Sequence, residues 1–121
     1  MARVLIVDDA AFMRLMLKKI VMVAGHEVVG EAGDGETAVS MFRELSPDLT
    51  TLDITMPDKD GIQVLREILS IDPAARVVMC SALGQQAKVV ESMKIGARDF
   101  VVKPFESGTV HEAIRNALGD A

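Results

Sequence analysis

The sequence has no tryptophan, no tyrosine and only four phenylalanines, so side chains that could stack on a flat aromatic cofactor are scarce. This scarcity argues against a flavin carrier, whose site needs aromatic rings against the flavin. The single cysteine, Cys80, cannot form an internal disulfide and lies in an apolar run. We therefore expect a small buried side chain there and a reduced, cytoplasmic setting.

Long apolar runs and basic runs are also missing. No stretch approaches the ~20 apolar residues of a membrane-spanning helix, and the apolar start meets two carboxylates too early for a signal peptide. The 13 Lys and Arg residues are scattered among 18 Asp and Glu residues, which gives a net charge of −5. Affinity for nucleic acid comes mainly from basic residues, so we expect neither nucleic acid nor an anionic membrane as a partner.

Short apolar runs alternate with segments of helical periodicity along the whole chain. Strands are predicted at 4–7, 27–30, 49–52, 76–80 and 100–102, and helices at 10–23, 35–45, 61–71, 85–95 and 107–118. Most of the strand-like runs lack polar alternation, which is typical of a parallel sheet covered on both faces. Each helical segment ends beside a glycine or a proline. The pattern predicts an α/β sandwich of five strand–helix units in one domain, 1–121.

Groups that could bind a cation and a phosphoryl group follow the predicted strands. Parallel strands end at a shared edge of the sheet, and there the sequence places Asp8 and Asp9, Asp53, Ser81 and Lys103. Crowded carboxylates raise one another's pKa unless a cation offsets their charge, and Mg2+ prefers such oxygens. Each residue alone would suit a helix cap or a solvated surface. Their shared edge favours a Mg2+-assisted site in which a carboxylate acts as nucleophile and Lys103 and Ser81 bind phosphoryl oxygens.

Four ordered segments resemble the receiver domain of two-component response regulators: VLIVDD at 4–9, LDITMPDKDG at 52–61, CSA at 80–82 and GARDFVVKPF at 96–105. The resemblance covers the whole chain. It implies a flavodoxin-like, doubly wound fold with a five-stranded parallel sheet of order 2-1-3-4-5 and five helices.

The same resemblance implies roles for individual residues. Asp53 would be the phosphoacceptor, and Mg2+ would be held by Asp8, Asp9, Asp53 and the backbone carbonyl of Thr55. Ser81 would be the switch hydroxyl, and Lys103 would bind the phosphoryl group and precede a cis Pro104. Phe100 would be the switch aromatic, turning inward by packing alone when Ser81 moves. The alternative for Phe100 is a permanently buried ring.

The resemblance implies a signalling switch that catalyses at most its own Mg2+-dependent phosphorylation and dephosphorylation. A histidine kinase would phosphorylate it. The stretch SALGQQ at 81–86 resembles stand-alone chemotaxis receivers, which implies binding to a flagellar motor switch protein or a phosphatase. A monomer is the default expectation.

The predicted partner surface consists of Val89, Ile95 and Phe100. On a helical wheel of 85–95, Val89 falls at the edge of the inward stripe and Ile95 well off it. That inward stripe is formed by Ala87, Val90 and Met93. Isolated exposed aliphatic residues are also ordinary on protein surfaces.

The same residues bear on two other functions. A phosphorelay receiver that passes phosphate to a histidine phosphotransfer domain stays open, because sequence separates it poorly from a motor-binding receiver. An Asp-nucleophile phosphohydrolase typically has a second Asp two residues after the nucleophile. Here Ile54 and Thr55 follow Asp53, so the general acid of such an enzyme is missing.

Overall fold

The computed structural model describes residues 1–119, so the last two residues of the predicted 1–121 domain lie outside the described residues. Strands and helices alternate along this part of the chain. They are β1 (Arg3–Val7), α1 (Ala11–Val23), β2 (Glu27–Ala32), α2 (Gly35–Leu45), β3 (Leu49–Asp53), α3 (Gly61–Ile71), β4 (Val77–Ser81), α4 (Gln86–Ile95), β5 (Asp99–Val102) and α5 (Ser107–Leu118). The predicted bounds agree with these to within two residues.

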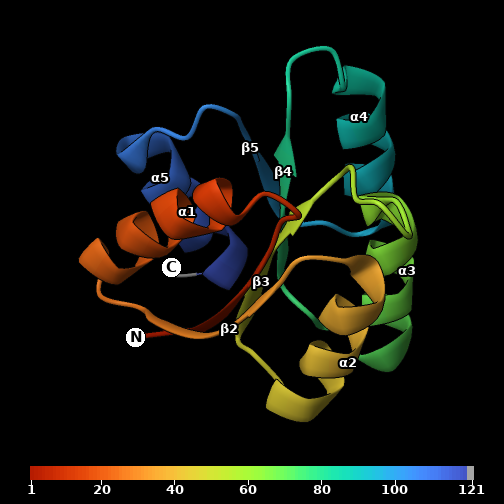
Figure 1. Ribbon diagram of the computed structural model, residues 1–121, viewed down its shortest axis with the longest axis horizontal. Helices are drawn as coiled ribbons and strands as arrows, with labels where there is room; N and C mark the ends of the chain where they lie inside the picture. Colours follow the sequence, from red (N-terminus) through yellow and green to blue (C-terminus); the bar gives the residue numbers. More distant parts are fainter. Residues whose placement is uncertain (120–121) are drawn as a thin grey trace.

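The strands form one five-stranded sheet of order β2-β1-β3-β4-β5 in which every pair is parallel. Helices α1 and α5 cover one face, and α2, α3 and α4 cover the other (Figure 1). The predicted flavodoxin-like sandwich is therefore confirmed. The chain leaves β1 for β2 on one side and returns to β3 on the other, so strand order reverses at β1 and β3. Open α/β sheets bind their ligands at such a reversal, outside the carboxyl ends of the strands.

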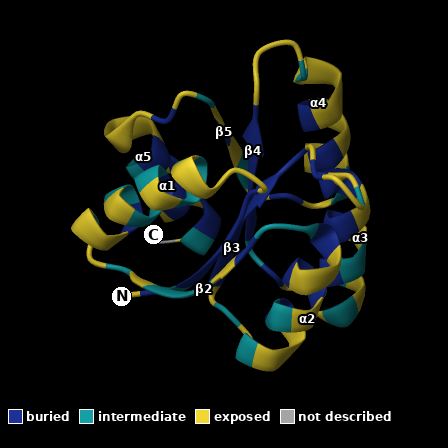
Figure 2. Ribbon diagram, viewed as in Figure 1, coloured by how far each residue is buried: buried dark blue, intermediate teal, exposed yellow. Residues whose placement is uncertain are grey.

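The core consists of two layers, one on each face of the sheet (Figure 2). In β1, Val4 and Ile6 face the layer that contains residues of α1 and α5, whereas Leu5 and Val7 face the layer under α2, α3 and α4. All four side chains are at most 1% exposed. Burying an aliphatic side chain of this size contributes about 1.5–3 kcal/mol. The unbroken apolar run of β1 follows from this double burial.

Aspartate side chains tie the loop after β3 to two helices. Asp60 caps α3 by accepting a hydrogen bond from the backbone N–H three residues on, at 2.9 Å. Asp58 reaches the start of α2, where its two carboxylate oxygens accept from the N–H groups of Gly35 and Glu36 at 2.8 and 2.9 Å. These hydrogen bonds lower the pKa of Asp58 below its usual value. The loop that leaves Asp53 is thus attached to both α2 and α3.

Within residues 1–119, none of the helices is long and apolar enough to cross a membrane.

The peptide bond between Lys103 and Pro104 is cis, as the resemblance implies.

Candidate functional site

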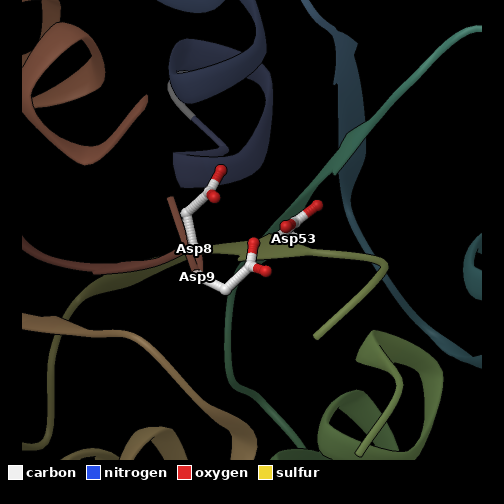
Figure 3. Close-up of side chains that lie close together, drawn as sticks. All are labelled: Asp8, Asp9 and Asp53. Carbon is white, nitrogen blue, oxygen red and sulfur yellow. The ribbon is translucent and has the colours of Figure 1, made fainter. Parts of the chain in front are cut away.

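Three carboxylates meet where β1 and β3 end. Val7 pairs with Leu52 in the parallel register of these strands, so Asp8 and Asp53 extend neighbouring strands in step. One oxygen from each of Asp8, Asp9 and Asp53 lies within 4.8 Å of the others, and Figure 3 shows the three side chains gathered at this edge. Asp8 and Asp53 are 2% and 5% exposed, while Asp9 faces solvent.

Lys103, just after β5, reaches two of these carboxylates. Its Nζ lies 2.8 Å from Asp8 Oδ2 and 3.3 Å from Asp53 Oδ1. Burial alone would lower the pKa of Lys103, but the hydrogen bonds and charges of Asp8 and Asp53 outweigh burial and raise it. The lysine therefore stays charged at neutral pH.

Burial and the charge of Asp8 raise the pKa of Asp53 to about 6, and Lys103 offsets part of this effect. The site thus holds three carboxylates but only one ammonium group close to them. A divalent cation would supply the missing positive charge, and the all-oxygen donor set suits a hard ion such as Mg2+. The residues present therefore fit the metal that receiver domains bind.

Arg14 fixes the loop that carries the first two carboxylates, a role that sequence reasoning missed. Its Nη1 donates to the backbone carbonyl of Asp8 at 2.7 Å, and its Nε donates to Glu31 Oε1 at 3.3 Å. The side chain of Asp8 also accepts from the backbone N–H of Ala10 at 2.9 Å. Arg14 lies on α1 beyond the acidic motif, so only the fold shows that it reaches back to β1.

Gly61, the first residue of α3, packs against the backbone of Asp53. A Cβ at this position would collide with the Asp53 carbonyl oxygen and with Ile54 Cα. The N–H of Gly61 donates to the carbonyl of Ile54. The start of α3 therefore packs directly against the main chain of Asp53, and position 61 requires a residue without a side chain.

The remaining predicted site residues surround the cluster on neighbouring strands and loops. Ser81 ends β4 and is 2% exposed, and its backbone carbonyl accepts from Lys103 N–H at 2.8 Å. Thr55 is exposed in the loop after β3, where its hydroxyl accepts from Gln85 Nε2 at 2.8 Å. Phe100 on β5 is 41% exposed. The alternative of a permanently buried Phe100 is therefore wrong.

Helix α4 presents the opposite face from the predicted one. Val89, predicted at the surface, is 8% exposed in the core, and Ile95 is half-buried against the same core. Val90 and Met93, predicted to point inward, are 53% and 38% exposed. The inward positions of α4 include Ser92, whose hydroxyl bonds to the helix backbone. Because this buried residue is polar, apolar periodicity pointed to the wrong face.

An apolar groove of about 580 Å³ lies between α4 and β5. Val90 and Met93 line it from the helix, and Phe100 and Val102 line it from the strand. Ser81 reaches the same groove. The groove thus connects the end of β4, beside the acidic cluster, with the outer face of α4.

Comparison with known proteins agrees with this geometry. Residues 4–115 match the family described as response regulator receiver domain. The chemotaxis protein CheY of Thermotoga maritima is 58% identical over 112 residues, which is 93% of this chain and 93% of that protein. The chemotaxis protein CheY of Bacillus subtilis is 56% identical, covering 96% of this chain and 97% of that protein.

Among solved structures, the CheX–CheY–BeF3–Mg2+ complex from Borrelia burgdorferi contains a similar chain. It superposes with a TM-score of 0.92 at 38% identity, covering 98% of this chain and 90% of that one. By sequence and by fold, the chain belongs to the response regulator receiver domain family.

Proposed function

We propose that this receiver is a chemotaxis response regulator that accepts a phosphoryl group on Asp53 from a histidine kinase and signals by binding a partner protein. One observation carries the proposal: three carboxylates and Lys103 converge at the sheet edge where β1 and β3 end. The chemotaxis assignment rests on the two CheY relatives. The phosphoryl transfer and the partner binding take place in the cytoplasm, where the buried thiol of Cys80 stays reduced.

Asp53 is the nucleophile in this scheme. With a pKa of about 6, its carboxylate is mostly ionised at neutral pH. An oxygen of Asp53 forms a bond to phosphorus while the bond from phosphorus to the donor's histidine nitrogen breaks, so the imidazole leaves. Asp8, Asp9, Asp53 and the Thr55 carbonyl would hold Mg2+, which would supply positive charge for the phosphoryl oxygens.

Lys103 and Ser81 respond to the new phosphoryl group. Lys103 exchanges its contact with the Asp53 carboxylate for a phosphoryl oxygen. Ser81 turns its hydroxyl toward another phosphoryl oxygen and vacates space at the end of the groove. The Phe100 ring, exposed in this structure, then turns into that space.

The partner binds over α4 and β5. The groove there is lined by exposed Val90 and Met93 and by the strand residue Phe100, so a change in Phe100 alters the surface that a partner meets. A flagellar motor switch protein or a phosphatase is the proposed partner. The CheY chain from Borrelia burgdorferi was solved in complex with CheX.

Intact mass after incubation with acetyl phosphate tests the phosphorylation. Wild type is expected to gain a labile phosphoryl adduct that requires Mg2+, whereas Asp53→Asn gains none because it lacks the nucleophilic oxygen. Glu112→Gln, an exposed α5 substitution, is the control. No adduct on folded wild type in saturating Mg2+, or an equal adduct on Asp53→Asn, would overturn the proposal.

A further inference from the structure

Gln85 joins two loops beside Asp53 through a single side-chain amide. Its Oε1 accepts from the backbone N–H of Ala82 at 2.7 Å, and its Nε2 donates to Thr55 Oγ1 at 2.8 Å. A backbone N–H can only donate, so the amide oxygen has to face Ala82 and the amide nitrogen has to face the hydroxyl. The contacts themselves therefore fix the orientation of the amide.

The two ends of this bridge belong to the loops that leave β3 and β4. Thr55 stands two residues after Asp53, and Ala82 follows Ser81 directly. Strands β3 and β4 pair in parallel as far as Asp53 and Cys80, so both loops start at the edge that carries the acidic cluster. Gln85 is half-buried between them.

The bridge occupies a hydrogen-bond donor that a phosphoryl group at Asp53 could use. Backbone N–H groups at a strand end are common ligands of phosphoryl oxygens. The N–H of Ala82 is adjacent to Ser81 but is bonded to Gln85 in this structure. Residues 82–84 are exposed, and Gly84 has a φ of 89°. This loop can therefore move without unpacking core side chains.

We propose that Gln85 is a positioning residue that holds the loop after β4 in its resting place and releases it when a phosphoryl group arrives. The proposal rests on the proposed phosphorylation of Asp53. Release of the bridge frees the Ala82 N–H to turn with Ser81 toward the phosphoryl oxygens. Because the bridge stabilises the resting state, it lowers the affinity of the site for a phosphoryl group.

Beryllofluoride, the group present in the CheX–CheY complex, serves as the probe, and its binding in saturating Mg2+ is followed by fluorine NMR. Gln85→Ala is expected to bind it about two- to tenfold more tightly than wild type, the range that one net hydrogen bond corresponds to. Thr55→Val removes one of the two contacts and is expected to give part of the gain. It adds nothing to Gln85→Ala, because both substitutions break the same bridge.

Gln86→Ala, at the adjacent exposed glutamine, is the matched control and leaves the affinity unchanged. Mg2+ affinity is measured for every variant, because a purely structural bridge would alter the melting temperature but not the ratio of beryllofluoride to Mg2+ affinity. Should Gln85→Ala fail to fold, Gln85→Met keeps the length of the side chain and loses both contacts.

Weaker beryllofluoride binding by Gln85→Ala would mean that the bridge assembles the site, and unchanged binding would mean that it has no part in activation. Either result overturns the proposal. Absence of beryllofluoride binding to folded wild type in Mg2+ is a different outcome, since it would overturn the proposed function itself.

Discussion

At the scale of single residues, two aspartates in one loop region have pKa values that move in opposite directions. Burial and the nearby charge of Asp8 raise the pKa of Asp53 to about 6. Hydrogen bonds from Gly35 and Glu36 lower the pKa of Asp58. Two side chains of the same chemistry, five positions apart, therefore affect stability in opposite ways.

Asp58→Asn is expected to lower the melting temperature at neutral pH. The N–H groups of Gly35 and Glu36 bond to different carboxylate oxygens, and in Asn one of these two positions is held by an amide nitrogen, which cannot accept. Because the pKa of Asp58 is lowered in the folded state, its contribution is present above its unfolded pKa and is lost as pH falls through the folded value. The difference from wild type should therefore shrink in acid. Thermal melts across pH, with Glu112→Gln as control, check this; a difference that does not depend on pH would contradict it.

Asp53→Asn is expected to stabilise the metal-free fold. The raised pKa of Asp53 means that ionisation of this buried carboxylate costs folding free energy. The gain should be absent below pH ~4, where the carboxyl is protonated in both states, and should reach about 1–3 kcal/mol above the folded pKa. Urea unfolding followed by circular dichroism in a chelating buffer measures it. A variant less stable than wild type at neutral pH would mean that Lys103 more than offsets the cost.

At the scale of elements, α3 acts as a support for Asp53. Gly61→Ala is expected to push the start of α3 away from the backbone of Asp53, since the new methyl group would collide with that carbonyl. Both the rate of phosphorylation by acetyl phosphate and the melting temperature should fall. Gly108→Ala, near the start of α5 with open space around its Cα, is the control. Wild-type phosphorylation in Gly61→Ala would show that α3 can shift without moving Asp53.

The outer face of α4 gives a second prediction at this scale. Val90→Asp places a charge in the groove and should weaken binding of a motor switch protein or phosphatase at least tenfold, while phosphorylation persists. Val89→Asp instead buries a charge in the core and should destabilise the fold. Pull-downs with beryllofluoride-treated protein, together with thermal melts, separate the two variants. Full partner binding by Val90→Asp would place the partner elsewhere.

The sequence predicted which segments form helices and strands better than it predicted which side of a helix is buried. The alternation of strands and helices and the meeting of Asp8, Asp9, Asp53 and Lys103 follow from apolar runs and from the rule that parallel strands end at one edge. The strand order was predicted only through the resemblance to receiver domains. The orientation of α4 does not follow, because a buried Ser92 breaks its apolar pattern. Contacts that depend on loop paths, such as those of Arg14 and Gln85, leave no periodic signal in the sequence.

At the scale of the whole molecule, stability is coupled to the ion that the acidic edge would hold. A ligand that binds the folded chain alone stabilises it, by about 2.7 kcal/mol at a concentration one hundred times its dissociation constant. Mg2+ should therefore raise the melting temperature of wild type more than that of Asp8→Asn, which loses a carboxylate. Thermal melts over a Mg2+ series test this, and equal shifts in the two proteins would argue against a metal site at Asp8.

Helix α4 is held to the rest of the molecule by little buried surface. Among the described residues it buries Val89 and Ser92, whereas α3 buries five residues along a helix of similar length. Elements with few buried contacts open at low free energy and exchange their amide hydrogens early. Since 1.4 kcal/mol changes an equilibrium tenfold, we expect one or two hydrogen bonds at the acidic edge to shift the local opening equilibrium of this helix measurably. Helix α4, which borders the groove, is thus among the helices of the described chain that bury the fewest side chains.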